Sequence, residues 1–474
     1  MSESVGTDKV LSTPIGKFEG CDIFIISAEN GETVIQTGKY SEPRPVSLEF
    51  TESIFTPFVT GKLVIDIPNG ILEEGNARIT SQDLLIFKLK IPFSLTTDDF
   101  IPPIEPSGVF FISSVTQTSS SEKTTTFEMT FMSIEGLNDL TTRIAKSYNK
   151  MKRSDIVIDI YDEYIKENAE LSQVTDTLHS DFCCVLPNWS PSKCIKWLST
   201  GSMDSGNPEC TNFFFFQRFN PDGELETIFT SLDDMIKEPT MGEEGRLESG
   251  YIVDILNDEE DPRKENHRER RGILEGKFRI PDINTTEYGG HGTWGGTLYF
   301  YDQTRKKYFE KEFNYREDGP EPFVDKNTKK FIEENKAIPE TLGAPASYKS
   351  MSHKHKFLFH SDEKDEGVDK RELWLDTTLT QKNLNFYKAF EIDIVGDTNR
   401  RVGECVTFAN MQIKNLTTEE DTITELDKDK KSMGGKYLVT DVVHRFTFSS
   451  SGEEDNQYHL TTLTLMRDGN PNGS

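Results

Sequence analysis

The chain has 474 residues, of which 53 are basic and 81 acidic, so its formal net charge is −28. Tight binding to a phosphate backbone needs clustered Lys and Arg, and this acidic balance disfavours that class of function. Residues 1–20 lack the apolar core of a signal peptide, and no later stretch reaches the roughly 18 apolar residues of a membrane helix. We therefore expect a soluble protein of two to four domains that is made in a cytoplasm and does not insert into membranes.

The six cysteines are scattered and form no CxxC pair. A long chain without an export signal gives little reason to expect disulfides, and zinc sites need closer ligand spacing. We therefore expect reduced thiols that are mostly packed in cores.

Residues 16–145 contain short runs rich in Phe, Val, Ile and Thr, separated by turn signals at roughly ten-residue spacing. The first two runs flank Asn30-Gly31, which is a favoured hairpin turn. Such spacing is typical of a small antiparallel β-barrel or sandwich.

The pattern changes to helical spacing after residue 150. Ser154 is placed to cap one amphipathic helix, and Ser190 followed by Pro191 marks the start of a second helix. Gly201 follows the expected end of that second helix. Both helices have the apolar face of ordinary amphipathic helices that pack on a domain.

The next run, "TNFFFFQRFNPDGELETIF", predicts a hairpin whose turn is formed by residues 220–223. Residues 241–380 are charged and irregular with a few strand-like segments, and we interpret them as an insertion. Strands resume from residue 386 and continue almost to the C-terminus.

The expected fold is mainly β with α+β parts. It has two related small antiparallel β-barrel (tube-like) domains, a helical segment between them and an inserted irregular or β region. The boundaries we assign are 14–145 for the first barrel, 146–205 for the helical segment, 206–240 with 381–468 for the second barrel, 241–380 for the insertion and 469–474 for a flexible tail.

Two distant strands share one pattern, "GVFFISSV" from Gly108 and "GKYLVTDV" from Gly435. The first is preceded by "LVIDI" and "DLLIF" and followed by "FEMTFM", and the second is preceded by "FEIDI" and "ECVTF" and followed by "HLTTLTLM". Ile65 to Ile112 spans 47 positions, and so does the interval from residue 392 to residue 439.

Chance similarity among β-rich segments is the alternative to a repeat. Four strands in the same order and at the same spacing favour a duplication instead. A chain that carries two copies of one module can form a pseudo-sixfold ring by assembling as a trimer.

The C-terminal run from "VGECVTF" to "HLTTLTLMRDGN" resembles the baseplate central hub proteins of contractile-tailed, T-even-like phages. It also resembles, more distantly, the hub part of type VI secretion spike proteins. The family pattern Y-x-V-x-x-V-x-H is matched here by Tyr437, Val439, Val442 and His444. The helix "NWSPSKCIKWLSTGS" followed by "TNFFFFQRF" is similar to the central element of that family. The resemblance covers most of the chain through loose motifs, and the insertion at 241–380 is longer than in the T-even proteins.

The resemblance implies a structural protein of the virion, synthesised in the host cytoplasm, that forms a homotrimeric ring in the tail baseplate. The ring would join the tail tube to the central cell-puncturing spike, and any lysozyme activity would belong to the spike partner. The other implied partners are the tail tube or tube-initiator protein, the tape measure protein and baseplate wedge proteins, with DNA only in transient passage. An acidic bore would let DNA pass without sticking, although the acidic side chains could equally lie outside.

We select alternating positions on the two repeated strands as ring-strand or subunit-interface residues. They are Phe110, Ile112, Val115, Tyr437, Val439, Val442 and His444. About half of them must be core residues, because side chains alternate between the two faces of a strand. His444 is expected to pack or to make an interface hydrogen bond rather than to do chemistry.

Enzymatic interpretations find little support in the chain. His291 lies in a glycine-rich loop like the oxyanion loop of esterases, but no G-x-S-x-G nucleophile elbow is present. His353 and His355 alternate on one strand and could bind a metal, but no well-placed Asp, Glu or Cys completes the set. We therefore expect no enzyme, with no catalytic residue, no metal and no cofactor.

The alternative function is a carbohydrate- or receptor-binding tail component. It would use exposed aromatic side chains such as Tyr288 and Trp294. A monomer in solution would favour this alternative over the ring.

Overall fold

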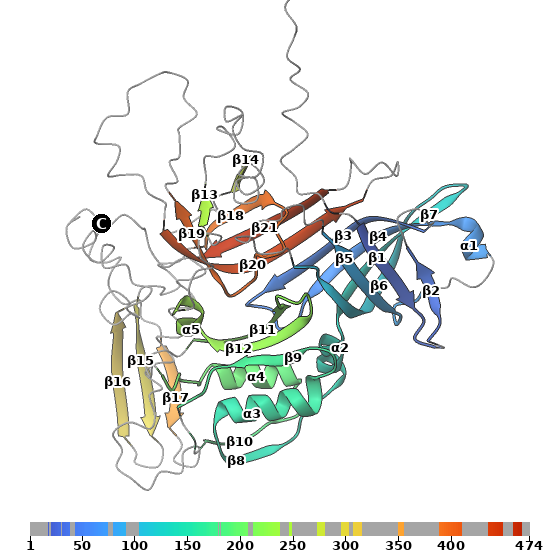
Figure 1. Ribbon diagram of the computed structural model, residues 1–474. Coiled ribbons are helices and arrows are strands. Elements are labelled where there is room, and N and C mark those ends of the chain that lie inside the picture. Colours follow the sequence, from blue (N-terminus) through green and yellow to red (C-terminus); the bar gives the residue numbers. More distant parts are fainter. Residues whose placement is uncertain are drawn as a thin grey trace, which may run out of the picture.

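The computed structural model has one long β-sheet and, below it in Figure 1, a smaller part built from helices and short sheets. The structure describes residues 18, 20–29, 31–37, 43–73, 79–91, 104–178, 180, 182–206, 212–237, 246–248, 273–279, 295–302, 307–314, 349–354, 388–409, 435–448 and 458–466.

The long sheet has 13 strands. Its N-terminal strands are β1 (Gly20–Ile26), β2 (Thr33–Gln36), β3 (Arg44–Ser53), β4 (Thr60–Pro68), β5 (Leu84–Lys90), β6 (Ser107–Ser120) and β7 (Thr124–Ser133). Its other strands are β13 (Arg246–Glu248), β14 (Ile273–Arg279), β18 (Lys388–Val395), β19 (Cys405–Ala409), β20 (Gly435–Thr447) and β21 (Tyr458–Met466). The hydrogen-bonded path runs β14-β18-β21-β20-β3-β4-β7-β6-β5-β1-β2, with β19 beside β20 and β13 beside β19.

Alternating side chains put one apolar face of each N-terminal strand into a common core. In β1 every second residue is buried, namely Cys21, Ile23 and Ile25, and β4 and β5 show the same alternation. Buried side chains from β1, β3, β4, β5, β6 and β7 form a single cluster that includes Phe50 and Phe87. These strands therefore enclose one core, which their period-2 pattern predicts.

The smaller part contains the helices α2 (Ile134–Thr141), α3 (Arg153–Ile160) and α4 (Pro191–Ser199) and a π-helical turn η2 (Tyr161–Ile165). Two small sheets accompany them. Strand β8 (Ser147–Met151) pairs with β10 (Phe182–Val185), and β9 (Glu170–Val174) pairs with β12 (Leu225–Ser231), which pairs with β11 (Phe213–Phe219). Buried side chains of the helices and of this second sheet form their own core.

The hairpin β11–β12 lies between three cores, and every residue of β11 is buried. Phe214 and Phe216 pack in the core of β18–β21, whereas Phe213 and Phe215 pack in the core of the helices. Phe219 reaches the core of the N-terminal strands. The four consecutive phenylalanines therefore serve two cores at once, because neighbouring strand residues point to opposite faces.

Sequence analysis assigns residues 206–240 to the second barrel. In the structure the strands of this hairpin pair with each other and with β9, and the face that carries Phe216 packs on β18–β21. The remaining elements are α1 (Asn69–Glu73), α5 (Leu232–Lys237) and a three-stranded sheet of β15 (Gly295–Asp302), β16 (Lys307–Asn314) and β17 (Lys349–Lys354).

The expected mainly-β class with antiparallel pairing is confirmed. Helices are short and few in the described residues, and the pairs β12–β9, β13–β19 and β15–β17 are the parallel ones there. Over the described ranges the strand path is open, with β14 at one end and β2 at the other. No helix in those ranges is long and apolar enough to span a membrane.

Most of the local signals hold in the structure. Strands β1 and β2 flank Gly31, which has a φ of 71°, and β11 and β12 flank Gly223, which has a φ of 80°. Both glycines adopt the left-handed conformation that these turns require. Helix α4 begins at Pro191 with Ser190 as its N-cap, as predicted.

The predicted cap of the first helix is wrong. Helix α3 begins at Arg153 with Lys152 as its N-cap residue. The side chain of Ser154 is occupied elsewhere, because its Oγ lies 3.2 Å from Thr177 Oγ1 and donates to Asp176 at 3.3 Å. Tertiary partners therefore outweigh the local capping signal.

Candidate assembly surface

The four strands repeated in the sequence pair with the same neighbours in both copies. In the first repeat (β4, β5, β6, β7), β6 lies between β5 and β7, and β7 also pairs with β4. In the second repeat (β18, β19, β20, β21), β20 lies between β19 and β21, and β21 also pairs with β18. The predicted duplication is therefore confirmed in strand order and topology.

The two copies also share fine backbone detail. A bulge interrupts β6–β7 pairing between Ile112 and Ser114, and a matching bulge interrupts β20–β21 pairing between Val439 and Asp441. The Ile112 N–H donates to the Asp83 carbonyl at 3.0 Å, and the Val439 N–H donates to the Glu404 carbonyl at 2.9 Å. A shared bulge and a shared hydrogen bond at equivalent positions are more specific evidence of a duplication than a similar composition.

The structure corrects one part of the sequence alignment. Leu63 pairs with Met129 in the first repeat, and Ile392 pairs with Leu463 in the second. The structural counterpart of Ile392 is therefore Leu63 rather than Ile65. The shift is two residues, and it escapes sequence comparison because the side chains of residues two apart lie on the same face of a strand.

The two repeats meet where the outer half of β20 pairs with β3. Residues 441–447 of β20 run antiparallel to residues 47–53 of β3. Figure 1 shows the red strands of the second repeat continuing into the blue strands of the first. Ser53 Oγ donates to Asp441 Oδ1 at 2.6 Å, and Arg445 Nε donates to Glu49 Oε2 at 2.7 Å across this junction.

An aromatic group fills the interior side of the junction. The Phe446 ring stacks on His459 with 4.0 Å between ring centroids and lies 5.9 Å from Phe50 of β3. His444 lies 5.0 Å from the Phe50 ring. Aromatic contacts at these spacings stabilise the junction beyond the area that they bury.

The selected ring-strand residues lie in the interior of the chain. Phe110 and Ile112 are fully buried in the core of the first repeat. Tyr437, Val439 and Val442 are buried in the core of the second. Val115 is partly buried and packs against the first core. Their role between subunits stays a prediction.

His444 is buried and makes contacts within the chain. Its Nδ1 lies 3.0 Å from His459 Nε2 and 3.2 Å from Thr461 Oγ1. Burial lowers the pKa of His444 to about 3, so the ring is neutral near pH 7. The histidine that matches the family pattern therefore packs and hydrogen-bonds within its own chain.

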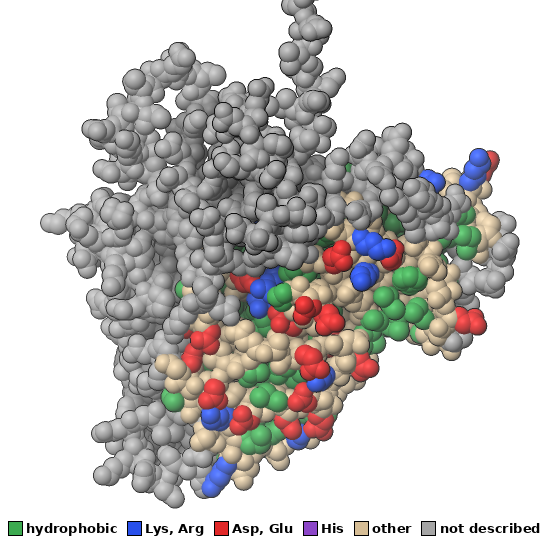
Figure 2. Space-filling model, viewed as in Figure 1, with side chains coloured by type: hydrophobic (Ala, Val, Ile, Leu, Met, Phe, Trp, Pro, Cys, Tyr) green, Lys and Arg blue, Asp and Glu red, His purple; other side chains and the backbone are tan. Residues whose placement is uncertain are grey.

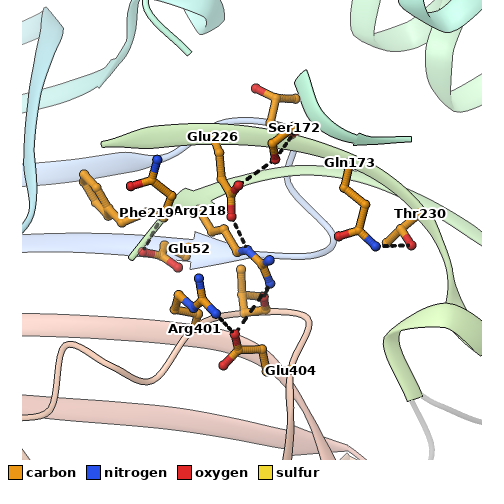
Figure 3. A network of polar contacts seen from close by, with 12 residues as sticks. Glu52, Ser172, Gln173, Arg218, Phe219, Glu226, Thr230, Arg401 and Glu404 are labelled. Atoms are coloured by element: carbon orange, nitrogen blue, oxygen red, sulfur yellow. Dashed lines mark hydrogen bonds and ion pairs between the residues drawn. The ribbon is translucent and has the colours of Figure 1, made fainter. Parts of the chain in front are cut away.

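A buried polar network connects the hairpin β11–β12 with the junction, and we define it as Glu52, Arg218, Glu226, Arg401 and Glu404 (Figure 3). Arg218 donates to Glu226 Oε1 at 2.7 Å and to the Val402 carbonyl at 3.2 Å, and its Nη1 lies 4.0 Å from Glu404. Arg401 also pairs with Glu404. Two arginines thereby balance two glutamates, which buried charges require.

Glu52 is the fifth member of this network and has no cation in hydrogen-bond contact. Its Oε1 accepts the Phe219 N–H at 3.4 Å, and its Oε2 is buried without a hydrogen bond. Burial raises the pKa of Glu52 to about 8, although the Phe219 N–H and the charge of Arg218 oppose the rise. Glu52 is therefore mostly protonated at neutral pH.

Sequence reasoning did not find this polar network. The sequence does contain one indication of it, a charged residue within an apolar strand segment, namely Arg218 in "FFFFQRF" and Glu52 in "LEFTES". A charged residue at a buried strand position needs a partner, but the sequence does not say which distant strand supplies it.

Figure 2 shows acidic side chains spread over the lower part of this face, where Figure 1 places α3 and α4.

In the described ranges no group of three or more His, Cys, Asp and Glu residues is arranged to hold a metal ion. His291, Tyr288 and Trp294 lie outside the described residues, as does His355. The esterase-loop and receptor-binding ideas therefore gain no structural observation.

No protein-family model and no curated protein matches the sequence. The fold is similar to that of solved structures, one of which is the tail protein from Neisseria meningitidis MC58, at 10% identity and a TM-score of 0.47 over 95% of this chain and 98% of that chain. Another is the 43 kDa tail protein of prophage MuSo2 from Shewanella oneidensis, at 9% identity and a TM-score of 0.48 over 95% and 99%. A third, the E. coli c3393 protein, is described as a type VI secretion component similar to T4 bacteriophage tail proteins. It has 8% identity and a TM-score of 0.39 over 92% and 76%.

These three structures are thus described as a tail protein, a prophage tail protein and a type VI secretion component.

Proposed function

We propose that this protein is the structural hub of a phage tail baseplate. Three copies would form a ring of six repeated modules that joins the tail tube to the central cell-puncturing spike. The protein would act in the virion by holding neighbours in place, without enzymatic activity.

The observation that carries the proposal is the duplication of one four-stranded unit within a single sheet. Both repeats have the same pairing and the same bulge, and the outer half of β20 joins the second repeat to β3 beside the first. Two equivalent units in each chain match a threefold assembly to sixfold symmetry. A tube with sixfold symmetry and a spike with threefold symmetry would both fit such a ring.

The core of the first repeat supports the finer idea of two barrel-like modules. Six strands of the N-terminal part surround one apolar cluster that includes Phe50, Phe87 and Phe110. The second repeat has its own cluster, which includes Ile392, Val439 and the hairpin residue Phe216. Each repeat with its added strands would form one segment of the ring wall.

The net charge of −28 suits a ring through which DNA passes. Acidic side chains around a bore repel the phosphate backbone and keep it from adhering. In addition to its own copies, the proposed partners are the spike, the tail tube or tube-initiator protein, the tape measure protein and baseplate wedge proteins.

Light scattering of the purified chain over a range of concentrations and salt levels tests the proposal. We expect a mass close to three times 54.0 kDa, which persists in high salt because apolar and backbone contacts are weakly screened. A monomer at every concentration would contradict self-assembly into a ring. That outcome would favour the receptor-binding alternative.

A further inference from the structure

Strand β6 extends well beyond its neighbour β5. Residues 107–111 of β6 pair with β5, and the other edge of the strand pairs with β7 along residues 110–120. In the described ranges no strand pairs with the outer half of β6, residues 114–120, on the β5 side. This segment, which we call the open edge, therefore offers unpaired backbone groups along its length.

The equivalent segment of the second repeat is covered. When Ile112 is aligned with Val439, residues 114–120 of the first repeat are equivalent to residues 441–447 of the second, and residues 441–447 pair with β3. Val442, His444 and Phe446 are buried there, whereas Val115 is partly buried and residues 116–120 are exposed. The difference in exposure follows from the presence of β3 at one copy and its absence at the other.

The composition of the open edge also favours pairing. Its seven residues, "SVTQTSS", carry no charge in a chain in which 28% of residues are charged. Natural proteins protect exposed edge strands with Lys, Pro or bulges that turn the edge away. The open edge has no Lys and no Pro, and its one protective feature of this kind is the bulge between Gln117 and Ser119.

A strand that could cover the open edge exists at the far end of the same sheet. Strand β14 pairs with β18 of the second repeat as β3 pairs with β4 of the first. Strand β3 uses its other edge to pair with the outer half of β20, while β14 has no second partner among the strands described. Strand β14 is therefore the counterpart of β3, and it terminates the strand path at the end opposite β2.

We propose that the open edge of β6 pairs antiparallel with β14 of a second copy of this chain. This pairing between chains would repeat the antiparallel pairing of β20 with β3 within one chain. The proposal rests on the ring of the proposed function. Each chain offers one open edge and one β14, so head-to-tail pairing with the threefold rotation of the proposed ring closes after three chains. The long sheet would then continue through all six repeats.

The internal junction also gives the register of the proposed pair. Arg445 pairs with Glu49, and Glu49 pairs with Lys62 of β4. The counterpart of Lys62 is residue 391, which pairs with Arg279 of β14. Arg445 pairs with Leu460, and the counterpart of Leu460 is Thr126, which pairs with Ser119 because β6 has a second bulge between Gln117 and Ser119. Ser119 of one copy should therefore lie opposite Arg279 of the next.

Disulfide trapping tests this register. Residues directly opposite in an antiparallel pair have Cα atoms about 4.5–5.5 Å apart, which suits a disulfide. The variant carries Ser119→Cys and Arg279→Cys in the full chain, and it is oxidised at the protein concentration used for light scattering. The control carries Ser119→Cys with Phe278→Cys, whose side chains would point to opposite faces. The unmodified chain, with its native cysteines, sets the background.

The expected result is a covalent trimer on a non-reducing denaturing gel for Ser119→Cys with Arg279→Cys. We expect at least a tenfold lower yield for the control. A native trimer that forms no such link, or links equally in both variants, overturns the β6–β14 pairing and leaves the ring proposal standing. A link that stays within one chain also overturns it. A native monomer without any link contradicts both proposals.

Discussion

Ionisable side chains are buried at the places where the parts of this chain meet. Glu52 of β3 and His444 of β20 are each only 2% exposed, and burial shifts the pKa of each toward its neutral form. The shift in Glu52 raises its pKa to about 8, and the shift in His444 lowers its pKa to about 3. The folded state therefore favours the uncharged form of both groups, which links the stability of the junction to pH.

The Glu52→Gln variant tests this linkage. The folded pKa of Glu52, about 8, lies above its ordinary value of 4.5, so its contribution to stability is complete below pH 4.5 and is lost as the pH rises toward 8. The variant lacks this loss. Relative to the unmodified protein, its free energy of unfolding should rise by up to about 1.4 kcal/mol per pH unit over that window.

Urea unfolding at pH 5, 6, 7 and 8 measures the difference between the two proteins. The control is Glu49→Gln, which removes an exposed carboxylate from the same strand, and its difference should stay nearly constant with pH. A constant difference for Glu52→Gln as well would mean that Glu52 is ionised in the folded protein.

At the scale of the element, close packing between strands limits which residues each position accepts. Gly61 of β4 lies opposite Phe50 and Phe131. A Cβ at Gly61 would lie 2.2 Å from Phe131 Cζ and 2.4 Å from the Glu49 carbonyl oxygen. The glycine therefore allows the phenylalanine ring to cross the strand.

The Gly61→Ala variant should be destabilised by about 1–3 kcal/mol, because the ring and the backbone of β3 must move apart. Gly70→Ala is the matched control, since a Cβ at Gly70 in α1 meets nothing within 4 Å. That substitution should be neutral or stabilising by up to about 1 kcal/mol. Thermal unfolding of both variants measures the contrast, and equal midpoints would contradict the packing argument.

At the scale of the whole molecule, the hairpin β11–β12 contributes buried side chains to all three cores, whereas β20 contributes to the cores of the two repeats. The side chains of the hairpin enter the core of the helices, the core of the first repeat and the core of the second. The polar network adds charge-assisted bonds from Arg218 to Glu226 and to the loop before β19. The three parts should therefore unfold together.

The Phe216→Ala variant tests this coupling. Phe216 is 1% exposed in the core of β18–β21, and its truncation should cost about 3–5 kcal/mol. Phe55→Ala is the control, because Phe55 is 41% exposed and should cost less than about 1 kcal/mol. Hydrogen exchange should show lower protection in β20 and β21 as well as in β11. Loss confined to β11 and β12 would contradict coupling through the hairpin.

Much of the local structure could be predicted from the sequence. Alternating apolar residues identified the repeated strands, glycine turns identified both hairpins, and Ser190 with Pro191 identified the start of α4. The cap at Ser154 and the two-residue alignment of β4 with β18 could not be obtained this way. In both cases the local sequence allows two positions, and a contact with a residue distant in the sequence selects one of them.

By itself the sequence determined the mainly-β class, the four strands of each repeat and the place of the helices between them. Only the tertiary structure decided that β20 pairs with β3, that β11–β12 lies between three cores, and that β6 has an open edge. The physical reason is that a period of two residues specifies which side chains are buried but carries no information about which edge a strand will meet. That choice depends on the summed packing of residues that lie as far apart as Ser53 and Asp441.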